Sequence, residues 1–129
     1  MTPNWIGVVA ALATFFSVWL GHVSVRAIEY RAASLTKPTI IYLALSAAAY
    51  LGSVLSGNLL VSAALGIAGT TLWFDALELR RQYKRVIKGH APANPQNPRH
   101  APHLANGRAT TTNWLDRAPG GRPLNREGA

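Results

Sequence analysis

Residues 38–74 read PTIIYLALSAAAYLGSVLSGNLLVSAALGIAGTTLWF and contain no charged side chain. Gly57-Asn58 lies near the middle of this stretch. A helix rises about 1.5 Å per residue and the hydrocarbon core of a bilayer is about 30 Å thick, so roughly 20 residues cross it. The stretch therefore predicts a helical hairpin that crosses a bilayer twice, with its turn at Gly57-Asn58.

A second charge-free stretch, from Met1 to Val25, predicts a third crossing. It lacks a basic start and is too long for a secretory signal peptide, so we expect it to be retained. The expected spans are residues 4–25, 39–56 and 58–79. Because no proline or glycine occurs between Phe74 and Gly89, the third helix should continue to residue 88. The predicted fold class is an all-α membrane protein, with three transmembrane helices in one domain, residues 1–88.

The basic residues indicate which way the spans run, because cytoplasmic loops carry an excess of Lys and Arg. Neither the N-terminus nor the Gly57-Asn58 turn contains one. The segments expected on the other side of the membrane contain Arg26, Arg31, Lys37, Arg80, Arg81, Lys84, Arg85 and Lys88. We therefore expect a multi-pass protein of the bacterial inner membrane, with its N-terminus outside and its C-terminus in the cytoplasm.

Small residues recur along the second and third predicted spans and indicate close helix packing. Such residues let helix backbones approach each other in lipid. The pattern suits either contact between these two spans or a dimer interface, and the two-residue turn favours contact within the chain. The glycines expected at this contact are Gly52, Gly66 and Gly69.

Polar side chains at helical spacing form a stripe at the expected cytoplasmic ends of the first and third spans. We expect the two stripes to face each other, because ionisable groups near a bilayer turn away from lipid and find partners. The candidate cluster consists of His22, Arg26, Glu29, Asp75, Glu78 and Gln82.

Three interpretations of this cluster are open. In the first, which we prefer, Arg26 pairs with Glu78 or Asp75, and His22 bonds Glu29 or a backbone carbonyl, forming a clamp between helices. In the second, the histidine and carboxylates bind a divalent metal, although the arginine among them disfavours a cation. In the third, the cluster relays protons or holds a small polar ligand. We expect no metal and no cofactor.

Residues 89–129 are rich in proline and arginine and offer little apolar surface, so we expect a disordered cytoplasmic tail. Trp114-Leu115 is its only sizeable apolar pair. Its positive charge either fixes topology or attracts anionic lipid headgroups. Nucleic-acid binding is disfavoured because aromatic stacking platforms are few. The irregularly spaced His90, His100 and His103 do not predict a metal site.

The order of several short motifs resembles a small bacterial family of three-span membrane proteins catalogued only as a domain of unknown function. The resemblance covers roughly residues 5–98 and places His22, Glu29 and Glu78 on matching positions. It implies the three-span fold and no activity. The motifs are Gly21-His22, Glu29-Tyr30, Asn58, Leu65-Gly66-Ile67-Ala68-Gly69, Trp73, Glu78-Leu79, Gln82, Arg85-Val86, Lys88-Gly89 and Pro92-Ala93-Asn94-Pro95.

The sequence favours a non-enzymatic function. It has no cysteine, no nucleophile-and-base arrangement and no glycine-rich phosphate loop. We expect an accessory or structural subunit that acts through helix–helix contacts, with the lipid bilayer and a larger complex or a second copy as partners. The alternative is a small transporter or proton-conducting element that uses His22, Glu29 and Glu78.

Overall fold

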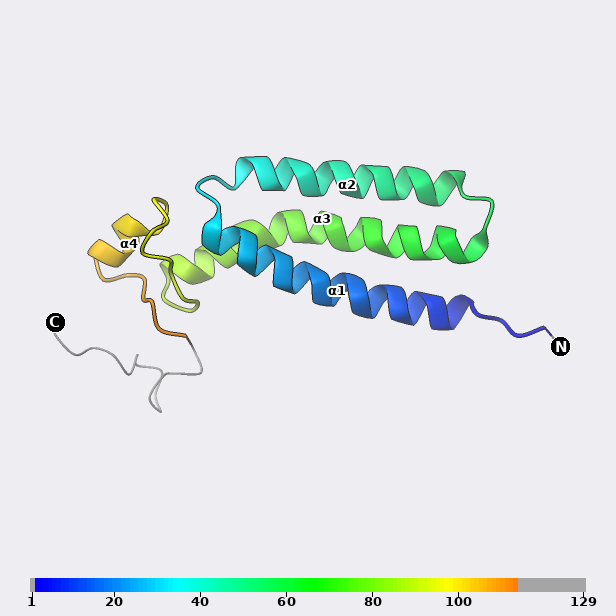
Figure 1. Cartoon of the computed structure of the whole chain (residues 1–129), viewed down its shortest axis with the longest axis horizontal. Coiled ribbons are helices and arrows are strands. Elements are labelled where there is room, and N and C mark those ends of the chain that lie inside the picture. Colours follow the sequence, from blue (N-terminus) through cyan, green and yellow to red (C-terminus); the bar gives the residue numbers. More distant parts are fainter. Residues whose placement is uncertain (1, 114–129) are drawn as a thin grey trace.

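A computed structural model describes residues 2–113 of the chain. Three long helices, α1 (Ile6–Arg31), α2 (Thr36–Leu55) and α3 (Leu59–Ile87), precede the short helix α4 (Ala101–Ala105). Each long helix has the length and apolar composition needed to cross a membrane. In Figure 1, α3 lies between α1 and α2 and packs against both. The structure thus confirms the all-α fold with three membrane-spanning helices.

The hairpin between α2 and α3 turns where the sequence predicts. Ser56 is the C-cap of α2, and Asn58 is the N-cap of α3. The Asn58 Oδ1 atom accepts hydrogen bonds from the backbone N–H groups of Leu60 at 2.9 Å and Val61 at 3.2 Å. This cap supplies an acceptor for two donors that the first turn of a helix leaves unpaired.

Small side chains form the contact between α2 and α3. Ser46 Oγ donates to the Gly69 carbonyl at 2.7 Å, while Ser53 and Ser62 each donate to the other's carbonyl at 2.7 and 2.8 Å. A Cβ atom on Gly69 would lie 3.2 Å from the Tyr50 ring and 3.3 Å from the Ser46 carbonyl oxygen. Gly52 and Gly66 also face the opposite helix of this hairpin. All three glycines therefore lie at the contact within one chain.

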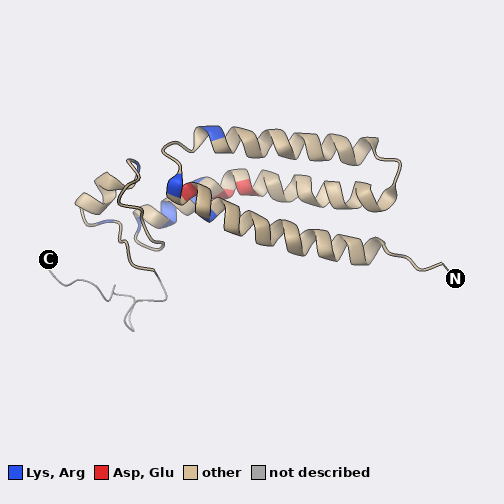
Figure 2. Cartoon of the chain, viewed as in Figure 1, with Lys and Arg blue, Asp and Glu red and all other residues tan. Residues whose placement is uncertain are grey.

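The apolar core of the three-helix unit lies at one end, where α1 and α3 end and α2 begins. Its buried members come from all three helices and are Val25, Tyr42, Ala76 and Leu79, with Ile28, Leu35 and Leu72 packed around them. Lys, Arg, Asp and Glu gather at this same end in Figure 2. We call it the basic end.

A folded segment, residues 89–113, follows α3 and covers the basic end; we call it the cap. Gly89 ends α3 with a positive φ of 73°, and the next N–H, of His90, bonds the Arg85 carbonyl at 2.8 Å. This is the glycine-ended helix stop of a Schellman motif. The cap has a small core of Val86, Ala91, Ala93 and Ala109, with Leu104 packed against it.

The prediction of a disordered tail from residue 89 onward is therefore wrong for residues 89–113. The physical reason is that the cap buries alanines, which a search for large apolar side chains passes over, and depends on hydrogen bonds to α1 described below. The rest of the predicted tail, with Trp114-Leu115, lies outside the described residues.

Substitution of Gly69 by leucine should destabilise the α2–α3 contact by about 1–3 kcal/mol, because overpacking displaces close-packed neighbours. Gly7 is the matched control, since a Cβ there meets nothing within 4 Å. Thermal unfolding of full-length Gly69→Leu and Gly7→Leu in detergent measures the difference. Equal melting temperatures for the two variants would contradict this helix contact.

Candidate functional site

The structure distributes the six residues of the predicted polar cluster over separate sites at the basic end. Glu29 is buried and faces the cap, whereas Glu78 and Gln82 face arginines of their own helix. Asp75 lies against Gly21 of α1. His22 and Arg26 are exposed. The expected pairing of Arg26 with Asp75 or Glu78 does not occur among the described residues.

Glu78 belongs to a short ion-pair network along α3. Its carboxylate lies 2.6 Å from an Arg85 nitrogen and 3.6 Å from an Arg81 nitrogen. Arg85 also donates to Gln82 Oε1 at 3.0 Å. The side chains of Arg81 and Arg85 are 62% and 50% exposed. Exposed pairs of this kind contribute little to stability.

Asp75 lies where α3 packs against Gly21 of α1. A Cβ atom on Gly21 would be only 2.5 Å from both Asp75 carboxylate oxygens, so the absence of a side chain at residue 21 makes room for this carboxylate. One turn further along α1, the hydroxyls of Ser24 and Tyr42 are hydrogen-bonded at 2.6 Å. This polar contact joins α1 to α2 beside the apolar core.

The most buried polar group joins α1 to the cap. Glu29 and His100 are 1% and 0% exposed, and their Oε1 and Nε2 atoms lie 2.8 Å apart. Arg99 brings its Nη1 atom within 3.3 Å of the same carboxylate oxygen and is 15% exposed. We call Glu29, Arg99 and His100 the cap clamp.

The hydrogen bonds of His100 assign its protonation. Its Nδ1 atom accepts from the Asn94 backbone N–H at 3.0 Å, so Nδ1 carries no proton. The ring proton is therefore on Nε2, which donates it to Glu29. A neutral imidazole satisfies both contacts, and the guanidinium of Arg99 balances the charge of the Glu29 carboxylate.

The cap also supplies donors to the last carbonyl groups of α1, which have no partner within the helix. The side-chain amides of Asn94 and Asn97 each donate to the Tyr30 carbonyl at 3.0 Å. Asn97 also donates to the Ala32 carbonyl at 3.1 Å, and Arg99 Nε donates to the same oxygen at 2.8 Å. A segment more than 60 residues away in sequence thus caps α1.

Tyr83 of α3 packs against Arg99 and His100 of the cap clamp. Its ring stacks on the His100 ring at a centroid distance of 6.3 Å, and the Arg99 guanidinium lies 5.0 Å from its centre. Its hydroxyl is 3.1 Å from His103 Nε2. Aromatic stacking and cation–π contact therefore tie the clamp to α3 as well as to α1.

The geometry of the cap clamp suits a structural role. Both ring nitrogens of His100 are engaged, so neither is free to accept a proton or bind a metal. Within residues 2–113, no group of three His, Asp or Glu side chains is arranged to hold a metal ion.

Sequence reasoning found Glu29 but missed its partners Arg99 and His100, and it missed Asn97. The available signal was the Pro-Ala-Asn-Pro motif at residues 92–95, whose asparagine bonds both Tyr30 and His100.

Loss of the Glu29 carboxylate should release the cap. Glu29→Ala leaves Arg99 and His100 without their acceptor, and breaking a buried pair costs about 3–5 kcal/mol. Glu78→Ala is the matched control, because its arginine partners are half exposed or more, and it should cost less than about 1 kcal/mol. Limited trypsin digestion after Arg99 and Arg108 measures cap release in detergent. Equal protection of these sites in Glu29→Ala and the unmodified chain would contradict the clamp.

Comparison with known proteins gives a match to a family model. No curated protein and no solved structure matches the chain. Residues 4–97 match a family model, and this range includes all three long helices, Glu29 and the two asparagines that cap α1. The chain therefore belongs to the family described as Domain of unknown function (DUF4491).

Proposed function

We propose that the protein is a non-enzymatic accessory or structural subunit in a membrane, in which three helices hold a rigid cap at one surface. The observation that carries this proposal is the buried pair in the cap clamp, with Glu29 and His100 almost fully buried. A group that binds or conducts a solute needs access to water, whereas a buried, fully bonded group fixes geometry. The clamp thus supports a role in positioning.

Contacts with other membrane helices are supported by the surface of α1. Gly21, Val25 and Glu29 are its only buried residues in the described chain, and all lie in its second half. Large apolar side chains are exposed on α1 and at its N-cap, among them Trp5, Val8, Leu12, Phe15 and Phe16. We propose that this surface contacts lipid and a partner helix, either from a larger complex or from a second copy.

The alternative of a transporter built on His22, Glu29 and Glu78 receives no support from their contacts. Glu29 is occupied by the cap, and Glu78 is occupied by Arg81 and Arg85. His22 is exposed. Three residues with such different surroundings do not form one pathway.

Affinity purification of the full chain in mild detergent, followed by mass spectrometry, tests the accessory role. We expect a stoichiometric protein partner to co-purify, and we expect Glu29→Ala to reduce its yield because the cap is no longer held. Glu78→Ala, which leaves the clamp intact, should retain the partner. If the unmodified chain brings down only itself in monomeric form, the accessory role is refuted.

We also propose that the basic end faces the cytoplasm and that the N-terminus lies outside an inner membrane, as the distribution of Lys and Arg favours. Because the chain has no cysteine, single cysteines can be labelled one at a time. Gly57→Cys should react with an impermeant maleimide from outside intact cells, whereas Lys88→Cys and Ala101→Cys should react only after lysis. Labelling of Gly57→Cys and Lys88→Cys from the same side would refute the hairpin topology.

A further inference from the structure

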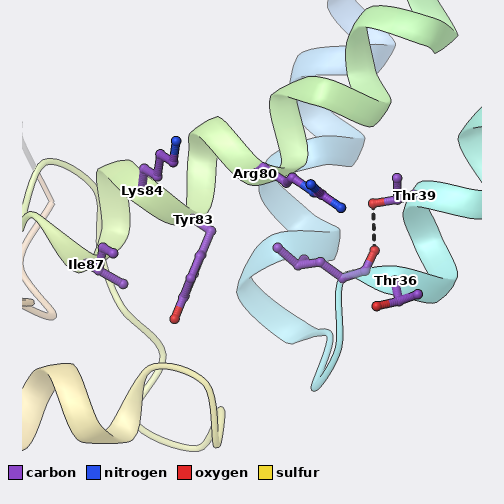
Figure 3. A pocket seen from close by; sticks show the side chains of 7 residues that line it. Thr36, Thr39, Arg80, Tyr83, Lys84 and Ile87 are labelled. Carbon is purple, nitrogen blue, oxygen red and sulfur yellow. Dashed lines mark hydrogen bonds between the residues drawn. The ribbon is translucent and has the colours of Figure 1, made fainter.

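A pocket of about 390 Å³ opens at the basic end, between the first turn of α2 and one face of α3 (Figure 3). In Figure 3, Arg80 extends from α3 towards Thr39 at the beginning of α2. The α3 residues recur at spacings of three and four, so they share one helix face. The pocket is lined by Leu35, Thr36, Thr39, Arg80, Tyr83, Lys84 and Ile87.

The two cations of this pocket differ from their neighbours in having no acidic partner. Arg81 and Arg85, on the adjoining face of α3, are paired with Glu78. Arg80 and Lys84 form no ion pair with any residue in 2–113, and no acidic residue lines the pocket. The pocket is therefore electropositive, and a bound anion would supply the missing charge.

The start of α2 adds to this positive field. Leu35, at its N-cap, provides no side-chain hydrogen bond, and the first turn contains no acidic residue. No acidic side chain offsets the positive end of the helix dipole here, and Ser34 Oγ accepts a hydrogen bond from the Thr36 N–H at 3.3 Å. Thr36 contributes an exposed hydroxyl at the same place.

We propose that this pocket binds the phosphate headgroup of an anionic phospholipid. Two cations and a hydroxyl suit a phosphodiester, and basic pockets between membrane helices bind such headgroups. The apolar walls, Leu35 and Ile87, and the position beside the start of the α2 span suit a ligand whose acyl chains continue into the bilayer. The inference rests on the membrane placement of the proposed function and does not depend on the accessory role.

Native mass spectrometry of the full chain in detergent, titrated with phosphatidylglycerol or phosphatidylcholine, tests the site. We expect tighter binding of phosphatidylglycerol. The double variant Arg80→Gln/Lys84→Gln should weaken that binding about 30-fold, the effect of two basic residues at about 1 kcal/mol each. Arg31→Gln/Lys88→Gln is the matched control; it removes the same charge from exposed positions outside the pocket and should change binding by less than about threefold.

A second variant tests the space in the pocket independently of its charge. Thr36→Trp fills the pocket without removing a cation and should also weaken binding of phosphatidylglycerol about tenfold or more, whereas Ala33→Trp, on an exposed residue outside it, should not. Circular dichroism of each variant checks that its helices are retained. Full binding by Thr36→Trp would overturn the pocket as the site.

Two further results would also overturn the proposal. An equal loss of phosphatidylglycerol binding in both double variants would show that the lipid is attracted to the whole basic end and not to the pocket. Displacement of the lipid by inorganic phosphate or glycerol phosphate at equal concentration would show that a soluble phosphate compound, not a lipid, is the ligand. Failure of soluble phosphate to compete supports the lipid.

Discussion

The last carbonyl groups of α1 need hydrogen-bond donors, and the arrangement of the basic end depends on how they are supplied. A helix that ends against protein cannot leave these groups unpaired without a large free-energy cost. Here the side chains of Asn94, Asn97 and Arg99 bond the carbonyls of Tyr30 and Ala32. The same constraint that ends α1 thus determines where the cap lies.

The buried carboxylate of Glu29 makes this docking specific. A charge removed from water is tolerated only when it is paired and hydrogen-bonded, so Glu29 requires both Arg99 and His100 in place. Tyr83 then packs on both of these side chains from α3. The cap is consequently tied to two helices, α1 and α3, that run side by side and reach the basic end together (Figure 1). Loss of Glu29 removes the one acceptor that Arg99 Nη1 and His100 Nε2 share.

The sequence predicts the helices well and the cap poorly, for physical reasons. The hairpin follows from missing charges, helix length and the Asn58 cap, all of which are local properties. The partners of Glu29 lie 70 and 71 residues away, and nothing in their local pattern indicates which carboxylate they meet. The cap core of alanines is also too small for composition to reveal. The sequence indicates Glu29 as a polar residue at the membrane edge, but its partners are set by the three-dimensional path of residues 89–113 back to α1.

The cap clamp and the pocket differ in whether their cations have a carboxylate partner. Among residues 2–113, the only acidic side chains are Glu29, Asp75 and Glu78. Glu29 is occupied by Arg99, and Glu78 by Arg81 and Arg85. Asp75 is enclosed against Gly21. No carboxylate of the described chain is left for Arg80 and Lys84. Within residues 2–113 their charge therefore stays unbalanced, which is the property that the proposed lipid headgroup site depends on.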